Sequence, residues 1–367
     1  MNKMNWKTKE KELKVLIANG LSNHDIAKMY GTTYDAVQSA LKRLDIQRGV
    51  IKEDSPVTNK QVSQNVNQII HTLQEELRKV TPCKKRVVEN MTHQGDTLVV
   101  HITDWHVGRI IKDEMGQTVY DEKVFEQRIN TLQQEMLGLL DRYIRKGTPI
   151  KDVAILSTGD IVDGQGIFAT QETLQELSPP FQVMTAAKTI QSFILALLER
   201  NLNVYFYGVK GNHGEIRVGG KNRDPNANWD FMLYLILDYW SKAVLRNKKV
   251  SINYSELDYL NFEIQGWKYH IRHIAPCQSE TSGGKAKFLG WAKKHGFNAL
   301  VYGHFHHWGV WDRSGITVFR GGSIPGGDEF AETLAEQSDP TQCIWGCNPK
   351  RPLTFFYPVD LGRKGLK

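Results

Sequence analysis

The sequence contains few cysteines and no long apolar run, and each shortage excludes a class of protein. Only four of the 367 residues are cysteine, and their irregular spacing argues against a disulfide-bonded scaffold and for a reducing compartment. No stretch reaches the roughly 18 apolar residues that a membrane-spanning helix needs. The first residues, Met-Asn-Lys-Met-Asn-Trp-Lys, are too polar for a secretory signal. We therefore expect a cytoplasmic protein with no membrane partner.

Two of the cysteines, Cys343 and Cys347, lie close together in the sequence. Thiolates at this spacing can share a metal, but a zinc site needs a second Cys or His pair at similar spacing, and none accompanies them. Unpaired structural thiols are therefore the favoured interpretation.

The chain is basic, and its positive charge is unevenly distributed. It has 47 Lys and Arg against 40 Asp and Glu, a net charge of +7 and a pI of about 9.0. Residues 1–50 hold nine Lys and Arg against five acidic residues, so this short segment carries +4 of the total. Such a segment favours polyanionic partners. With 40% hydrophobic residues, the chain is long enough to bury a large core and to form two domains.

Residues 1–50 have the pattern of three short helices joined by tight turns. Helices are expected at Glu10–Ala18, after Ser22, and from Thr32 or Thr33 through Leu44. Ser22 and Asp25 have the spacing of a capping box. The last helix carries apolar residues at helical spacing on one face and polar and basic residues on the other.

This arrangement resembles the helix-turn-helix of resolvases, invertases and many phage DNA-binding proteins. The resemblance implies that the segment binds DNA. A small helical cap or an oligomerisation module is the alternative. The side chains placed to contact DNA are Thr33, Tyr34, Gln38, Lys42 and Arg43.

The composition changes after residue 50. Residues 51–95 include a run rich in Gln, Asn and Ser, typical of a linker, and a predicted helix from about Asn67 to Val80. We therefore divide the chain into a helix-turn-helix domain (1–50), a linker with a helix (51–95) and a larger domain (96–367).

In the larger domain, apolar runs typical of strands alternate with longer stretches typical of helices. Strands are expected at Thr97–Thr103, Val153–Ser157, Asn203–Val209, Lys268–His273 and Ala299–Tyr302, with others around residues 252–254, 261–264 and 317–320. Helices are expected at Tyr120–Ile144, Phe181–Arg200, Trp229–Leu245 and Lys285–Lys294. The mixture predicts the α/β class, as a sandwich of mixed sheets flanked by helices.

Five polar clusters each follow one of the predicted strands. They are Asp104-Trp105-His106, Gly159-Asp160, Gly211-Asn212-His213, His273 and Gly303-His304-Phe305-His306. Because ligands gather at the carboxyl ends of strands, these residues can meet at one edge. We expect the glycines to let the backbone turn sharply as it leaves each strand. Two carboxylates, four histidines and one asparagine, with His213 beside them, suit a pair of divalent metals and a proton donor, an arrangement that hydrolyses phosphate esters.

In their order, Asp-x-His, Gly-Asp-x-x-Asp, Gly-Asn-His, His and Gly-His-x-His, the clusters resemble the calcineurin-like metallophosphoesterase superfamily over about Leu98 to Ser323. The resemblance implies that His213 gives a proton to the leaving oxygen or steadies the phosphate. A ligand set rich in imidazole favours Mn²⁺, with Fe or Zn²⁺ as alternatives. The implied metal ligands are Asp104, His106 and His306 for one metal, Asn212, His273 and His304 for the other, and Asp160 for both.

Several nearby residues allow two interpretations. His270 competes with His273 as a ligand, and we prefer His273 because it lies nearer the strand end. Asp163 can orient a neighbouring group or form a turn with Gly164. Arg109 and Arg217 can grip a substrate phosphate or lie exposed at the surface.

The first cluster most resembles the nuclease subunit of double-strand-break repair complexes, and its combination with a helix-turn-helix resembles phage-encoded phosphoesterases of DNA metabolism. We therefore expect a DNA nuclease of a bacterial or phage-infected cytoplasm, with DNA as its partner. A homodimer is a further expectation, since the related nucleases often dimerise. The alternatives are a phosphatase or phosphodiesterase acting on small molecules or proteins, and a DNA-binding regulator with an inactive phosphoesterase fold.

Overall fold

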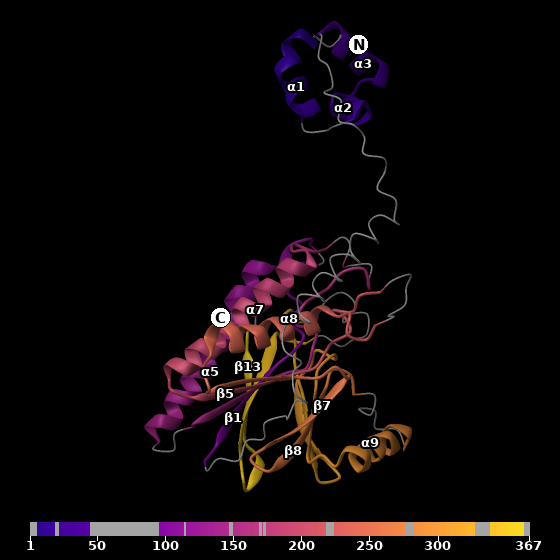
Figure 1. Cartoon of the computed structure of the whole chain (residues 1–367). Helices are drawn as coiled ribbons and strands as arrows, with labels where there is room; N and C mark the ends of the chain where they lie inside the picture. Colours follow the sequence, from indigo (N-terminus) through magenta and orange to yellow (C-terminus); the bar gives the residue numbers. More distant parts are fainter. Residues whose placement is uncertain are drawn as a thin grey trace. The chain divides into compact units, whose positions relative to one another are not determined.

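The computed structural model (Figure 1) describes residues 6–18, 22–44, 95–113, 115–146, 150–168, 171, 174–217, 224–275, 282–326 and 338–362. The chain separates into two compact units, Met1–Arg86 and Val87–Lys367. The predicted linker, with its helix from Asn67 to Val80, lies outside the described residues except for residue 95.

The described residues of the N-terminal unit form three α-helices where the sequence predicts them. Its elements are η1 (Trp6–Lys9), α1 (Glu10–Ala18), α2 (Asn23–Met29) and α3 (Tyr34–Arg43). Ser22 and Asp25 form the expected capping box, in which the amide of Asp25 donates to Ser22 Oγ (3.2 Å) and the amide of Ser22 donates to Asp25 Oδ2 (3.1 Å). Thr33 caps α3. The helices enclose a small core of Leu13, Ile26, Ala27, Val37 and Leu41.

The second unit is built on two main sheets. The six-stranded sheet has the order β13-β12-β1-β4-β5-β6, with strands at Thr97–Ile102 (β1), Asp152–Ser157 (β4), Asn203–Gly208 (β5), Val250–Tyr254 (β6), Thr341–Asn348 (β12) and Arg351–Asp360 (β13). The strands β1, β4, β5 and β6 are parallel, whereas β12 and β13 are antiparallel to their neighbours.

The second main sheet is mixed, and a short hairpin accompanies it. The five-stranded sheet has the order β10-β11-β9-β8-β7, with strands at Tyr259–Ile264 (β7), Trp267–Arg272 (β8), Ala299–Tyr302 (β9), Gly309–Arg313 (β10) and Ile316–Arg320 (β11). The strands β8, β9 and β11 are parallel. The hairpin pairs β2 (Ile111–Lys112) with β3 (Thr118–Tyr120).

Helices cover both outer faces of the sandwich. They are α5 (Glu122–Arg145), α7 (Pro179–Glu199), α8 (Trp229–Tyr239) and α9 (Ser282–His295). Figure 1 shows α5, α7 and α8 on one side of the sheets and α9 on the other. Three apolar clusters fill the layers: one under α5, α7 and α8, one between the two sheets and one under α9. The predicted α/β sandwich of mixed sheets is therefore confirmed.

Strand β1 illustrates why the sequence forms these layers. Its six residues are all buried, and alternate side chains point to opposite faces of the sheet. Leu98, Val100 and Ile102 belong to the cluster under the helices, and Val99 belongs to the cluster between the sheets. A strand covered on both faces therefore reads as a continuous apolar run.

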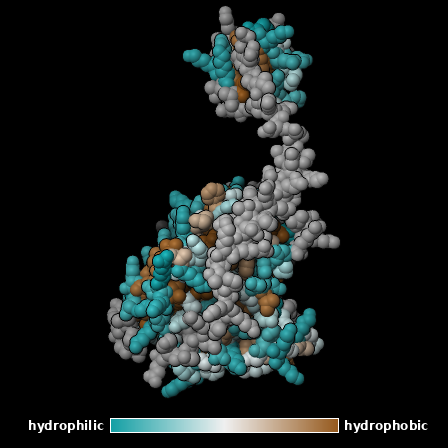
Figure 2. All heavy atoms as spheres, in the orientation of Figure 1, coloured by the Kyte–Doolittle hydropathy of each residue, from teal (hydrophilic) through white to brown (hydrophobic). Residues whose placement is uncertain are grey.

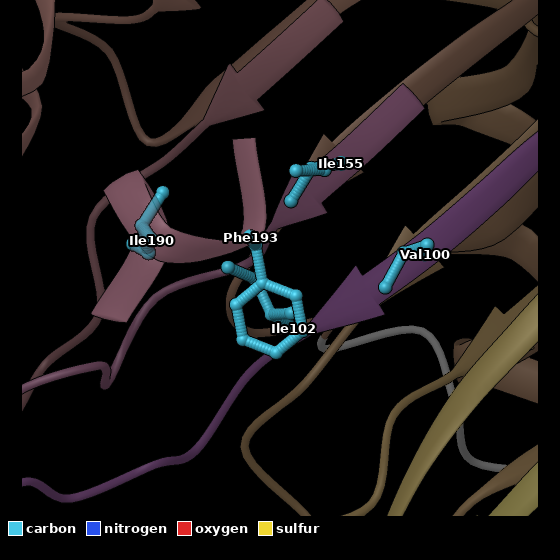
Figure 3. Close-up of a pocket in the computed structure, with 5 residues that line it drawn as sticks. All are labelled: Val100, Ile102, Ile155, Ile190 and Phe193. Carbon is cyan, nitrogen blue, oxygen red and sulfur yellow. The ribbon is translucent and has the colours of Figure 1, made fainter. Parts of the chain in front are cut away.

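Helix α7 packs closely against this sheet. Figure 3 shows Ile190 and Phe193 of α7 facing Val100 and Ile102 of β1 and Ile155 of β4. The cavity between them measures about 10 Å³, and its apolar lining gives a water molecule no hydrogen-bonding partner. The helix–sheet contact is thus dry and close-packed.

Helix α7 is apolar over most of its length. The mean hydropathy of an 18-residue window of this helix is 1.4, so by length and composition alone the helix could cross a membrane. The inward face is buried in the core, however, and the outward face exposes Phe181, Met184 and Leu195. Figure 2 shows hydrophobic atoms at the surface on this helical side of the unit. In this fold, α7 is a core helix with a partly apolar outer face.

Strands β12 and β13 lie where the sequence predicts none. β13 contains Pro352 and Pro358, and proline argues against a strand because it cannot donate a hydrogen bond to the ladder. β13 occupies the edge of the sheet, where one side of the strand needs no ladder partner, so the prolines are tolerated. Cys343 and Cys347 of β12 are buried and unpaired, and burial raises the pKa of each thiol to about 12.

The helix expected at Trp229–Leu245 is interrupted. Its α-helical part ends at Tyr239, and a π-helical turn follows over Trp240–Leu245. Arg246, with a φ of 51°, then ends the element.

His270 lies in the second sheet, on a strand face that packs against aromatic rings. It is fully buried, its Nδ1 lies 2.7 Å from Asn261 Oδ1, and its ring stacks against Tyr259 and Phe297. Burial lowers the pKa of His270 to about 3, and the nearby charges of His295 and Arg272 act in the same direction. The ring is therefore neutral in the folded protein at pH 7.

We predict that the unfolding free energy of the His270→Phe variant depends less on pH than that of the wild type. The pKa of His270 is lower in the folded state than its ordinary value of 6.5, so the unfolded state takes up the proton first as the pH falls. This residue should therefore cost the wild type about 1.4 kcal/mol of unfolding free energy between pH 7.5 and 5.5. Urea denaturation of both proteins at the two pH values measures the difference, and an equal decline in both would contradict the neutral burial.

Candidate active site

The seven predicted ligands lie together at one end of the sandwich. Asp104 and His106 follow β1, Asp160 follows β4, Asn212 follows β5, His273 follows β8, and His304 and His306 follow β9. Parallel strands bring their carboxyl ends to the same edge, so residues up to 202 positions apart in the sequence become neighbours.

One group of side chains consists of Asp104, His106 and His306, whose ligand atoms lie within 4.8 Å of one another. The Nε2 atoms of the two histidines are 3.2 Å apart. Asp104 Oδ1 lies 3.4 Å from His306 Nε2 and 3.9 Å from His106 Nε2. Asp104 and His106 are completely buried, and His306 is partly exposed.

A second group surrounds His273. Its Nε2 lies 3.0 Å from Asp160 Oδ2, 2.9 Å from Asn212 Oδ1 and 3.2 Å from His304 Nδ1. One ligand atom each of Asp160, His273 and His304 lies within 4.8 Å of the other two.

The hydrogen bond on the far side of His273 determines what this second group can bind. His273 Nδ1 lies 2.7 Å from the carbonyl oxygen of Thr158, which can only accept, so Nδ1 carries a hydrogen. In a neutral ring, Nε2 then holds a lone pair that faces an amide oxygen and a carboxylate oxygen. Three lone pairs directed at one another repel unless a cation lies between them. The site therefore fits a divalent metal. Without a metal, a proton on His273 Nε2 would take its place.

The pKa values agree with this interpretation. Burial lowers the pKa of His273, but the adjacent Asp160 carboxylate outweighs burial and raises it to about 9. Burial lowers the pKa of His106 and of His304 to about 4, so both rings are neutral at pH 7 and keep a lone pair for a metal. Burial opposes ionisation of Asp104, yet the hydrogen bond and charge of His306 hold its pKa below the ordinary value.

The backbone at this site is unusual. Five candidate ligands have a φ in the left-handed region, which non-glycine residues rarely adopt and which clusters at functional sites. They are Asp104 (50°), His106 (47°), Asp160 (51°), His304 (74°) and His306 (61°). The ligands themselves thus make the sharp turns.

The expected role of the neighbouring glycines is correct only for Gly159, which has a φ of 92°. Gly211 and Gly303 do not have a positive φ, and they are needed for close approach instead. A Cβ on Gly211 would lie 2.0 Å from Asp160 Oδ1, and a Cβ on Gly303 would lie 2.5 Å from Asp104 Oδ2. Any larger residue would push a carboxylate out of place.

Asp230, near the start of α8, is an important residue that the sequence motifs do not include. Its Oδ2 accepts hydrogen bonds from the amides of Asp160 (2.8 Å) and Gly211 (2.9 Å). Its Oδ1 accepts from the amides of Ile161 (3.1 Å) and Val162 (3.3 Å). Burial and the charge of Asp160 raise the pKa of Asp230 to about 6. One buried carboxylate therefore joins the loops that follow β4 and β5.

Gln342 of β12 fixes the loop that follows β1 in a similar way. Its Oε1 accepts from the amide of Thr103 (3.0 Å) and from Trp105 Nε1 (3.3 Å), and its Nε2 donates to the carbonyl of Thr103 (3.0 Å). Asp230 and Gln342 belong to no catalytic motif. The only sequence signal for either is that Asp230 is an acidic residue in the first turn of a helix capped by Asn228.

His213 lies beside the first group. Its Nδ1 is 3.2 Å from Asp163 Oδ1, and the same oxygen is 3.4 Å from His106 Nδ1. Burial lowers the pKa of His213, but the carboxylates of Asp160 and Asp163 outweigh it and raise the pKa above the ordinary value. Phe168 covers one face of the His213 ring, with centroids 4.5 Å apart. Asp163 orients a histidine and also precedes a turn, since Gly164 has a φ of 70°.

The other residues singled out in the sequence lie at varying distances from the two groups. Arg109 is half-buried, and its charge is near enough to lower the pKa of His213. Arg217 is paired with Glu215 through contacts of 2.9 and 2.8 Å. The structure does not bring His270 into the cluster. The residues expected to contact DNA, all exposed on the N-terminal unit, are Thr33, Tyr34, Gln38, Lys42 and Arg43.

Comparison with known proteins identifies the larger unit. The sequence profile of calcineurin-like phosphoesterases matches residues 97–308, which include every candidate ligand. The chain belongs to the calcineurin-like phosphoesterase family. No curated protein matches it. As a member of this family with His and Asp clusters able to hold metal ions, it is a metal-dependent phosphoester hydrolase.

Similar solved structures have low sequence identity. They include an archaeal phosphodiesterase (13% identity, covering 72% of this chain and 99% of that chain, TM-score 0.33). Vps29 from Entamoeba histolytica complexed with Zn²⁺ is similar at 14% identity, 72% and 99% coverage and a TM-score of 0.32. A hypothetical protein from Pyrococcus horikoshii OT3 is similar at 14% identity, covering 73% of this chain and 90% of that chain, with a TM-score of 0.36. At these values, the comparison carries no argument about substrate.

We predict that Asp230→Asn weakens metal binding, although Asp230 is not itself a candidate ligand. Asparagine keeps the shape but replaces one acceptor oxygen with an NH₂ group, so two backbone amides lose their acceptor. Loss of such a supporting contact typically lowers metal affinity about 10–100-fold. Calorimetric titration with Mn²⁺ measures the effect. Asp238→Asn on the same helix is the matched control, and equal Mn²⁺ affinity in folded Asp230→Asn would show that this carboxylate does not support the site.

Proposed function

We propose that this chain is a DNA phosphodiesterase that uses two divalent metals, and that its N-terminal unit binds DNA. The observation that carries the proposal is the convergence of seven lone-pair donors from five loops into two adjacent groups, with His213 beside the first group. Family membership supports phosphoester hydrolysis. The assignment to DNA rests on the basic, exposed face of the N-terminal unit and on the nuclease-like motif His101-Ile102-Thr103-Asp104-Trp105-His106.

In this proposal, the two groups hold one metal each. Asp104, His106 and His306 would hold one, Asn212, His273 and His304 the other, and Asp160 would contact both. When bound, such ions supply charge stabilisation to the phosphoryl oxygens and ease the deprotonation of water. An imidazole-rich set favours Mn²⁺ over Mg²⁺, and Fe or Zn²⁺ would also suit it.

The protein's own acid is His213. Because Asp163 engages Nδ1, the other ring nitrogen, Nε2, is the atom left to exchange a proton with the leaving oxygen. The carboxylates of Asp160 and Asp163 raise the pKa of His213 above its ordinary value, which favours the protonated ring that a general acid requires. Arg109 is half-buried near this ring, and it would neutralise charge on the bound phosphate.

We expect the Mn²⁺-loaded wild type to cleave linear or single-stranded DNA and to prefer bis-p-nitrophenyl phosphate over the monoester. His213→Asn should keep its metals and lose about 10²–10⁴-fold in kcat, whereas Asp160→Asn should lose both metal and activity. A gel assay and metal analysis provide the readouts. Rapid monoester turnover without DNA cleavage would instead favour the phosphatase interpretation. A biological effect unchanged by Asp160→Asn would favour an inactive DNA-binding regulator.

The DNA-binding role of the N-terminal unit can be tested separately. Lys42 and Arg43 lie in the last turn of α3, and reversing their charge should weaken DNA binding and lower the salt dependence, by about one unit of slope per lost phosphate contact. Turnover of bis-p-nitrophenyl phosphate should not change, since tethering affects KM and not the chemical step. Exposed Lys11 of α1, changed to Glu, is the control. Unaltered DNA affinity in the double variant would favour a helical cap or an oligomerisation module.

A further inference from the structure

A cavity opens beside the candidate metal groups, on the side of Asn212 and His273. Its volume is about 340 Å³, within the range of roughly 300–1,000 Å³ that small-molecule sites occupy. Asp104, His106 and His306 do not contribute to its described lining. A phosphate held at the second group would therefore lie beside this cavity.

Two cationic side chains line the cavity, and both are held in place. Lys210 is almost completely buried, and its Nζ donates to the carbonyl oxygens of Pro225 and Glu256, at 2.7 Å each. Arg272 donates from Nε to the carbonyl oxygen of Ile274 (2.6 Å), and its guanidinium lies 3.9 Å from the ring centroid of Trp291. A guanidinium fixed against an aromatic face is well prepared to bind an anion.

Two acidic residues, Glu215 and Asp258, also line the cavity. Glu215 is already engaged by Arg217, with an oxygen 2.8 Å from the guanidinium. Asp258 lies 4.0 Å from Lys210 Nζ, but its side chain is 82% exposed, and solvent screens such a charge. Asp224 and Glu256 also place negative charge near Lys210, so Arg272 is the cation of this lining on which a phosphate contact depends.

We propose that this cavity binds the nucleotide adjacent to the scissile phosphate, and that Arg272 contacts that nucleotide's own further phosphate. The proposal rests on the phosphodiesterase function above and specifies its substrate as an oligonucleotide carrying consecutive phosphates. Lys210 holds the loops at Pro225 and Glu256 in place through its hydrogen bonds, and Arg272 contributes the direct contact. Aryl diesters and dinucleotides without a terminal phosphate lack the group that Arg272 would bind.

The test uses the full-length, Mn²⁺-loaded protein and four substrates: bis-p-nitrophenyl phosphate, the thymidine dinucleotide, and the same dinucleotide with a 5′- or a 3′-terminal phosphate. For Arg272→Ala, we expect KM for one phosphorylated dinucleotide to rise about tenfold or more through loss of a charge-assisted contact, with kcat little changed. The other substrates should be nearly unaffected, and Arg272→Lys should be intermediate. Arg313→Ala, which removes a guanidinium stacked on Phe288 outside the cavity, should behave as wild type.

The possible outcomes are distinct. Equal losses on all four substrates, in a variant whose thermal unfolding is unchanged, would make Arg272 a structural residue and overturn the proposal. A wild type that cleaves dinucleotides without distinguishing the added phosphate would also overturn it, while leaving the nuclease function intact. If the wild type hydrolyses only the aryl diester, the DNA assignment and the cavity assignment are both wrong.

Discussion

The mutual repulsion of lone pairs around His273 Nε2 is the constraint on which the rest of the site depends. Carboxylate, amide and imidazole atoms approach this nitrogen to within 3.2 Å, and a metal ion or a proton between them makes that approach favourable. The protein maintains the arrangement without help from solvent, because Asp160 and His273 are buried. The left-handed backbone at the candidate ligands and the close approach at Gly211 and Gly303 are consequences of bringing so many acceptors to one point.

The supporting residues show how the structure offsets that cost. Asp230 accepts hydrogen bonds from four amides of two loops. Gln342 fixes the loop after β1 from β12, the strand that pairs with β1 on the side away from β4. Both side chains are buried and act through backbone hydrogen bonds, which are strong in such surroundings. We therefore expect metal affinity to depend on these supporting residues as well as on the candidate ligands. The buried carboxylates of Asp160 and Asp104 raise the pKa of His273, so without a metal this histidine binds a proton instead.

Much of the fold and most of the site could be predicted from the sequence, for identifiable reasons. Strands such as Ala299–Tyr302 are buried on both faces, so they appear as apolar runs, and the polar residues that follow them mark the edge of the sheet. Strand β13 could not be predicted because its prolines are acceptable only at a sheet edge. Asp230 and Gln342 were missed because their role depends on which loops lie nearby, and this is a property of the tertiary structure. Gly211 and Gly303 appeared to be turn residues, since sequence does not distinguish a sharp turn from a close approach.

In the proposed function, substrate choice depends on the side chains beside the two groups, with Arg272 near the second group and His213 and Phe168 near the first. None of this applies unless the two groups hold metal. The most direct measurement is anomalous scattering at the manganese edge from crystals grown with Mn²⁺, supported by elemental analysis. The account predicts two ions per chain, one among Asp104, His106 and His306 and the other beside His273. A site without metal after ample supplementation, or a single ion bound elsewhere, would contradict it.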